Sequence, residues 1–136
     1  MKEFLENIAT YNDFPVKGVV FKDLLGLLLK PEIFNKLIIE MASSQSIKKC
    51  DAILAIEARG FLFGSAISLL SKKPLVVARK PEKLPGELIL KSYDLEYGSN
   101  TLTIQKESLK NFQSFNIVDD VLATGGTLKC ACDLLK

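Results

Sequence analysis

The 136-residue sequence contains no histidine, only three cysteines and no apolar run long enough to span a membrane. Without histidine, proton transfer near neutral pH must fall to carboxylates, lysines, tyrosines or the substrate itself. Cys50, Cys130 and Cys132 form an odd set without metal-site spacing, which favours reduced, buried thiols and no metal ligands on the chain. The start Met1-Lys2-Glu3 does not resemble a secretory signal, so a cytoplasmic protein is expected.

The chain also lacks a strong excess of either positive or negative charge. The net charge is only +2, and the basic residues are scattered apart from a local cluster between Arg79 and Lys83. This distribution favours neither nucleic acid nor a membrane surface as a partner.

Apolar runs with the length of buried strands alternate with helical patterns along the chain. Strands are predicted at 52–56, 75–78 and 115–119, and helices from Pro31, over 61–70 and after the last strand. This order predicts an α/β fold with a doubly wound, mainly parallel sheet and flanking helices, in a single domain over 1–136.

Two segments depart from the alternation. Residues 1–25 predict a short helix with Phe4, Leu5 and Ile8 on one face, a turn-rich stretch from Tyr11 to Gly18, and a brief extended piece at 19–21. Residues 81–106 form a long excursion that includes a possible β-hairpin near Thr101–Ile104. Such a long insertion in a compact domain is typical of an active-site lid.

The most informative stretch runs from Ile117 to Thr127. An apolar strand meets two acids, Asp119 and Asp120, and then a small glycine-rich loop that opens into an amphipathic helix. Backbone N–H groups and the helix dipole converge there, which favours a bound phosphate. Two acids at the end of a strand suit the hydroxyls of a sugar attached to that phosphate. The plain alternative is an ordinary connection with two solvated acids.

Five blocks then carry a resemblance to a known family, in the same order over nearly the whole chain. They are Phe14–Asp23, Glu57–Gly64, Arg79–Gly86, Tyr93–Gly98 and the stretch from Ile117 to Thr127. The last block resembles the signature of type I phosphoribosyltransferases, and the set resembles their adenine phosphoribosyltransferase family. The resemblance implies transfer of the phosphoribosyl group of 5-phosphoribosyl 1-pyrophosphate to adenine, giving AMP and pyrophosphate in purine salvage. It also implies a homodimer and Mg²⁺ bound mainly through the substrate pyrophosphate and ribose hydroxyls.

The resemblance also implies site roles. The 5-phosphate would lie on the loop, the ribose hydroxyls on Asp119 and Asp120, and the pyrophosphate on Arg59, Arg79 and Lys83. The phosphate loop consists of Ala123, Thr124, Gly125, Gly126 and Thr127.

Further roles concern the base and the lid. Glu96 would handle the proton beside adenine, with Tyr97 positioning the lid. Phe21 would give adenine an apolar face, while Val20 and Lys22 offer backbone hydrogen bonds. Taken alone, Glu96 and Lys83 would be solvated surface residues and Phe21 a core residue.

Three departures from the family pattern stand out. Lys22 replaces a common arginine, Glu82 replaces a common glycine, and a C-terminal strand region is expected to be missing after Lys136. The alternatives are therefore a phosphoribosyltransferase for another base, or a catalytically silent phosphoribosyl-pyrophosphate or AMP binder that acts as a fragment or partner subunit.

Overall fold

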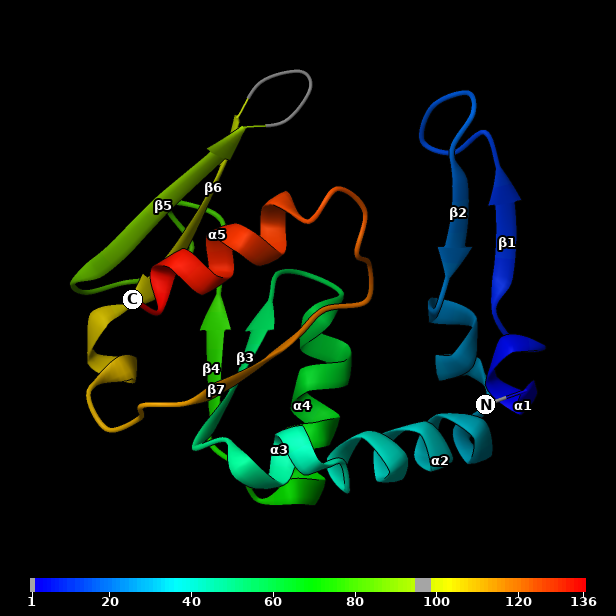
Figure 1. The fold of residues 1–136 in the computed structure, drawn as a ribbon, viewed down its shortest axis with the longest axis horizontal. Coiled ribbons are helices and arrows are strands. Elements are labelled where there is room, and N and C mark those ends of the chain that lie inside the picture. Colours follow the sequence, from blue (N-terminus) through cyan, green and yellow to red (C-terminus); the bar gives the residue numbers. More distant parts are fainter. Residues whose placement is uncertain (1, 95–98) are drawn as a thin grey trace. The chain divides into compact units, whose positions relative to one another are not determined.

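The computed structural model describes residues 2–94 and 99–136 (Figure 1). The chain divides into two compact units, Met1–Met41 and Ala42–Lys136. Within the described ranges, no helix has the length and apolar character needed to cross a membrane.

The N-terminal unit is a β-hairpin flanked by helices. Its elements are α1 (Lys2–Leu5), β1 (Ala9–Asn12), β2 (Val20–Asp23), the 3-10 helix η1 (Leu25–Leu29) and α2 (Pro31–Ala42). Strands β1 and β2 pair antiparallel, with Tyr11 opposite Phe21. The extended piece around Val20 and the helix from Pro31 are confirmed. The prediction that the turn begins at Tyr11 is wrong, since β1 extends to Asn12; β1 is exposed throughout and so has no alternating apolar pattern.

The second unit contains the parallel sheet that the strand–helix alternation predicts. Its order is β4-β3-β7, with β3 (Ala52–Ile56) paired in parallel to both β4 (Leu75–Ala78) and β7 (Phe115–Val118). The helices are α3 (Gln45–Lys49), α4 (Gly60–Ser71) and α5 (Gly126–Leu134). This arrangement confirms a mixed α/β fold with a parallel sheet and flanking helices.

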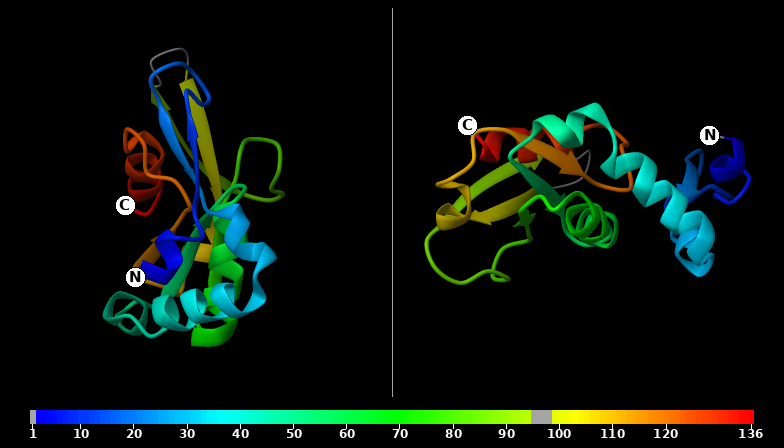
Figure 2. Two further views of the ribbon diagram at one scale, coloured as in Figure 1. Left: turned by 90° about the vertical axis from the view of Figure 1, so that its right-hand side faces the viewer. Right: turned by 90° about the horizontal axis from the view of Figure 1, so that it is seen from below.

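Strand β3 is buried along its whole length because helices cover both faces of the sheet (Figures 1 and 2). Helix α4 packs on the face that carries Ala55, so closely that a Cβ on Gly64 would lie 2.6 Å from the Ala55 Cβ. The opposite face, with Leu54, packs against α5, whose Ala131 is fully buried. The continuous apolar run of β3 follows from this two-sided burial.

A second hairpin lies between β4 and β7 in the chain. Strands β5 (Leu88–Asp94) and β6 (Ser99–Gln105) pair antiparallel beside α5, and the 3-10 helix η2 (Lys106–Leu109) follows (Figure 2). The predicted hairpin is confirmed but is longer than Thr101–Ile104. Its base joins the sheet through two backbone hydrogen bonds between Arg79 and Thr103, of 2.9 and 2.7 Å.

Candidate active site

A cleft of about 400 Å³ opens at the carboxyl ends of β3, β4 and β7. Open α/β sheets bind their ligands at this edge. Its walls bring together Arg59, both predicted acids and the whole predicted phosphate loop. The lining residues are Ile56–Arg59, Lys80, Tyr93, Asn100–Leu102 and Asp119–Leu128.

The loop from Ala123 to Thr127 lines the cleft and leads into the N-terminus of α5. Gly125, at the N-cap of α5, has a φ of 83°, a left-handed conformation that favours glycine. The helical hydrogen bonds begin only with Lys129 N–H to the Gly125 carbonyl, at 2.9 Å. The N–H groups of the first turn therefore lie at the positive end of the helix, as phosphate binding requires.

Tyr93, from β5, lies directly against this loop. The Thr127 hydroxyl donates a hydrogen bond of 3.0 Å to the Tyr93 hydroxyl oxygen. A Cβ on Gly126 would lie 3.1 Å from the Tyr93 ring. Tyr93 thus connects the hairpin to the phosphate loop. Tyr93 had no predicted role of its own, although it begins the motif that contains Glu96.

The two acids at the end of β7 have different surroundings. Partial burial, reinforced by the charge of Asp120, raises the pKa of Asp119 to about 6, although the Asp120 N–H and Arg59 act in the opposite direction. The Asp119 Oδ1 accepts the Asp120 N–H at 2.9 Å. The side chain of Asp120 is only 3 % exposed. The site therefore pairs one acid of raised pKa with one buried carboxylate.

Arg59 meets Asp120 across the cleft. Its Nε lies 2.9 Å from the Asp120 Oδ2, an ion pair between the loop after β3 and the loop after β7. Apart from this ion pair, the buried Oδ2 of Asp120 accepts no hydrogen bond among the described residues. The approach depends on Gly60, where a Cβ would lie 2.8 Å from the Val118 carbonyl oxygen.

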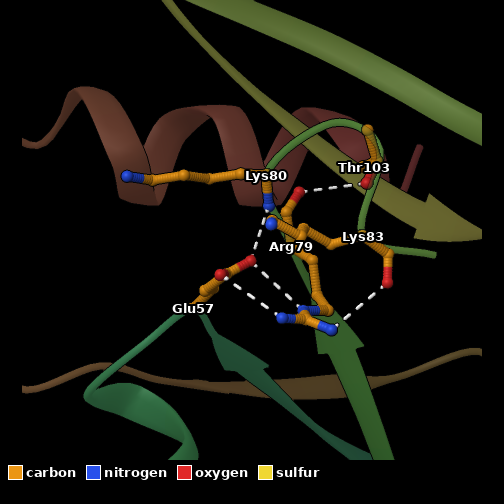
Figure 3. Close-up of polar contacts among 5 residues, drawn as sticks. All are labelled: Glu57, Arg79, Lys80, Lys83 and Thr103. Carbon is orange, nitrogen blue, oxygen red and sulfur yellow. Dashed lines mark hydrogen bonds and ion pairs between the residues drawn. The ribbon is translucent and has the colours of Figure 1, made fainter.

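The other predicted pyrophosphate cations occupy a network beside this pair (Figure 3). The Arg79 guanidinium contacts the Glu57 carboxylate and donates to the Lys83 carbonyl oxygen at 3.2 Å. Lys83 joins the network through its backbone, whereas Lys80 lines the cleft. The pyrophosphate roles of Arg79 and Lys83 remain predictions. Glu57 and Lys80 had no predicted role, although each follows shortly after a strand that ends at this edge of the sheet.

The predicted base-binding residues lie on β2 of the N-terminal unit. Val20 is exposed, and Phe21 makes an edge-to-face contact with Phe14, with ring centroids 5.2 Å apart. The Lys22 ammonium donates to the Thr10 hydroxyl at 2.7 Å. Their roles toward a base remain predictions. Glu96 and Tyr97 lie outside the described residues.

The positions of the acidic and thiol side chains indicate whether the protein itself could hold a metal ion. Among the residues that the structure describes, no three carboxylate or thiol side chains cluster closely enough to hold a metal ion. The buried Asp120 oxygen without a donor nevertheless suits a ribose hydroxyl or a water bound to Mg²⁺.

Comparisons with known proteins agree with this geometry. A family model described as "Phosphoribosyl transferase domain" matches residues 28–136. An adenine phosphoribosyltransferase of Prochlorococcus marinus (strain MIT 9515) is 58% identical, over 98% of this chain and 78% of the relative. A crystal structure of adenine phosphoribosyltransferase from Thermoanaerobacter pseudethanolicus is similar, with a TM-score of 0.90 and 41% identity over 98% of this chain and 78% of that chain. The Saccharomyces cerevisiae enzyme, complexed with D-2,5-dideoxy-2,5-imino-altritol 1,6-bisphosphate and adenine, has a TM-score of 0.87 and 35% identity, with the same coverage.

Proposed function

The chain belongs to the phosphoribosyltransferase family and, within it, to the adenine phosphoribosyltransferases. We infer from this that it transfers a phosphoribosyl group to adenine. The donor is 5-phosphoribosyl 1-pyrophosphate, and the products are AMP and pyrophosphate. One observation carries this proposal. A single cleft holds a phosphate loop, two strand-end acids and Arg59, the groups that a ribose carrying two phosphate substituents requires.

The ribose 5-phosphate half of the donor fits the loop side of the cleft. The phosphate would accept hydrogen bonds from the first-turn N–H groups of α5 and from the hydroxyls of Thr124 and Thr127. The ribose hydroxyls would donate to Asp119 and Asp120. Binding would give the Asp120 oxygen the donor that it lacks among the described residues.

The pyrophosphate half fits the opposite wall. In the reaction, the bond between the anomeric carbon and the pyrophosphate oxygen breaks, and its electron pair leaves with pyrophosphate. Arg59 would stabilise the departing charge, and the carboxylates of Asp119 and Asp120 would stabilise the positive charge that builds on the ribose. A ring nitrogen of adenine then forms the new bond to the anomeric carbon, and the nitrogen proton of adenine is lost.

The acceptor base would bind at β2, with Phe21 against the ring and Val20 and Lys22 at its edge. Glu96 would accept or share the proton beside adenine, with Tyr97 on the same segment. This part rests on the family resemblance. The acceptor in the yeast complex supports adenine as the base.

Magnesium fits this site as a companion of the substrate. It would neutralise pyrophosphate oxygens, with Asp119 and Asp120 near its ribose ligands rather than as a protein cage. We also propose a homodimer, because Leu62, Leu69 and Leu70 on α4 are all exposed. Sedimentation of the purified chain would give the mass of a dimer under this proposal.

The decisive experiment measures AMP formation from phosphoribosyl pyrophosphate, Mg²⁺ and adenine, with guanine and hypoxanthine in parallel. Turnover confined to adenine supports the proposal. Turnover with another base would reassign the acceptor. Binding of the donor without turnover would leave a silent binder.

Two variants separate binding from chemistry. Asp120→Asn removes the buried charge beside the ribose, so the donor should bind about 10- to 100-fold more weakly. Glu96→Gln should lower kcat by about 10² while donor binding is preserved. If both variants keep wild-type kinetics, these assignments are wrong.

A further inference from the structure

Glu57 is the first residue after β3 and receives three donors from the end of β4 (Figure 3). Its Oε2 accepts the Lys80 N–H at 2.8 Å and the Arg79 Nε at 3.2 Å, and its Oε1 accepts the Arg79 Nη2 at 3.4 Å. The Glu57 side chain is 14 % exposed. Burial raises its pKa, but the bonds from Lys80 and Arg79 outweigh burial and hold the pKa below its usual value. Glu57 is therefore charged near neutral pH and accepts three hydrogen bonds.

Arg79 has several partners among the described residues, although its side chain is 32 % exposed. Its guanidinium contacts Glu57 twice, donates to the Lys83 carbonyl, and lies 5.9 Å from the centre of the Phe61 ring. The Arg79 carbonyl accepts both the N–H and the hydroxyl of the fully buried Thr103. A planar guanidinium with these partners can hold the segments on either side of it in place.

Lys80 lies next to this fixed point and extends in another direction. Its N–H is bound to Glu57, while its side chain extends away from the Arg79 guanidinium (Figure 3). Lys80 also lines the cleft, together with Arg59 and Asp120. The backbone bond at Lys80 therefore fixes the point from which the Lys80 side chain extends along the wall of the cleft.

We propose that Glu57 and Arg79 are a positioning pair, which holds the Lys80 backbone so that the Lys80 ammonium faces the pyrophosphate half of the cleft. Arg79 acts through Lys80 and does not contact pyrophosphate itself. This inference rests on the proposed function, because it assumes that pyrophosphate occupies this wall. It replaces a direct role of Arg79 with an indirect one and assigns a role to Glu57.

The test is a set of mutant cycles read by calorimetric titration of magnesium pyrophosphate. Glu57→Gln and Arg79→Gln are made both in the wild-type chain and in Lys80→Met. Each single variant should weaken pyrophosphate binding about tenfold, as expected when a charge-assisted bond is lost. In the Lys80→Met background, neither change should weaken binding by more than about twofold, because the group on which they act is gone.

Three controls show whether a change in pyrophosphate binding comes from the positioning pair. Ribose 5-phosphate should bind every variant within about twofold of wild type, which also reports a folded loop half. Glu87→Gln removes the exposed ion pair with Lys106 outside the cleft and should change nothing. Arg79→Lys keeps the charge but loses the fork, so it should behave like Arg79→Gln. This variant also decides the question if Glu57→Gln does not fold.

The opposite results are equally clear. A direct contact of Arg79 with pyrophosphate would make Arg79→Gln cost a further tenfold in the Lys80→Met background, and Arg79→Lys would retain binding. Tighter pyrophosphate binding by Glu57→Gln would show that Glu57 competes with the ligand. Either result overturns the positioning role. If the wild-type chain itself binds neither pyrophosphate nor phosphoribosyl pyrophosphate, it is the proposed function that fails.

Discussion

The cleft has two halves, and each would bind an anion with different groups: backbone N–H groups in one half and cationic side chains in the other. The loop half, from Asp119 to Thr127, is one continuous stretch that presents backbone N–H groups and hydroxyls at the start of α5. The cation half is assembled from the ends of β3 and β4, and in it Arg79 pairs with Glu57. Arg59, at its border, pairs with Asp120 of the loop half.

The two halves also keep their geometry in different ways. A backbone receptor is fixed by the helix that follows it and loses little when one side chain changes. A receptor of long cationic side chains has many rotamers, and these must be restricted by carboxylate partners before the ligand arrives. The Arg59–Asp120 pair differs from the Arg79–Glu57 pair, because each of its members has a proposed ligand partner. Arg59 would contact pyrophosphate, and Asp120 would contact a ribose hydroxyl.

The largest effect on stability and on KM is expected from a substitution at Gly60, where the loop half and the cation half meet. Gly60→Ala would place a Cβ 2.8 Å from the Val118 carbonyl and push α4 away from the end of β7. We predict a loss of about 1–3 kcal/mol in the free energy of unfolding. We also predict at least a tenfold rise in KM for phosphoribosyl pyrophosphate, because Arg59 moves away from Asp120.

Gly64→Ala is the matched control. Its Cβ would lie 2.6 Å from the Ala55 Cβ, on the same helix but away from the cleft. It should destabilise the chain while KM stays near the wild-type value at a temperature where the chain is folded. Equal KM changes in the two variants would contradict a specific role for Gly60.

The next largest effect is a pH dependence that belongs to the loop half. Because the pKa of Asp119 is raised to about 6, its carboxylate is protonated as the pH falls through 6 and becomes a poorer acceptor for ribose hydroxyls. Ribose 5-phosphate affinity should fall in that range. The ligand phosphate titrates there too, so Asp119→Asn, measured in parallel, gives the ligand's own share.

The stability effect of Asp119 has the opposite sign. A folded pKa above the unfolded value means that the folded state binds more protons, so the contribution of Asp119 to the free energy of unfolding should increase from about pH 7 to pH 5. Asp119→Asn should flatten this segment in denaturant titrations. An identical profile in both proteins would contradict the raised pKa.

A smaller effect tests the connection between hairpin and loop. Tyr93→Phe removes the acceptor of the Thr127 hydroxyl and should weaken ribose 5-phosphate binding by about two- to fivefold, the cost of one neutral hydrogen bond. Pyrophosphate binding should not change. Ser92→Ala, which removes a hydroxyl contact to Thr101 on the same hairpin, is the control. Equal losses for both ligands would show that the hairpin as a whole has been disturbed.

The smallest effect concerns the backbone of the cation half. Glu82 has a φ of 66°, in the left-handed region that favours glycine. Glu82→Gly should therefore raise the free energy of unfolding, by up to about 1 kcal/mol. Glu82→Gln keeps the strained backbone without the charge and should show no gain. A gain in the glutamine variant instead would assign the effect to charge.

The same contrast explains what the sequence could predict. The sequence predicts the loop half as one unit, because Asp119, Asp120 and the glycines of the loop are adjacent in the chain, and the structure places them along one cleft. The buried strand β3 and helix α4 were equally visible, because apolar runs and helical periodicity report burial directly.

The contacts of the cation half could not be predicted from the sequence. Glu57 and Arg79 are 22 residues apart and meet only because β3 and β4 are parallel neighbours. A sequence shows that Lys80 is basic, but not that its N–H is held by Glu57 while its side chain lines the cleft. Strand β1 was missed for a related reason, since its exposed residues show no pattern of burial.

The most direct measurement asks whether the cleft has two separate anion subsites. Ribose 5-phosphate is titrated calorimetrically into the chain, first alone and then in the presence of saturating magnesium pyrophosphate. We predict that both ligands bind together, with Asp120→Asn weakening the first and Glu57→Gln the second. Mutual exclusion of the two ligands by the folded chain would contradict the division of the cleft into a loop half and a cation half.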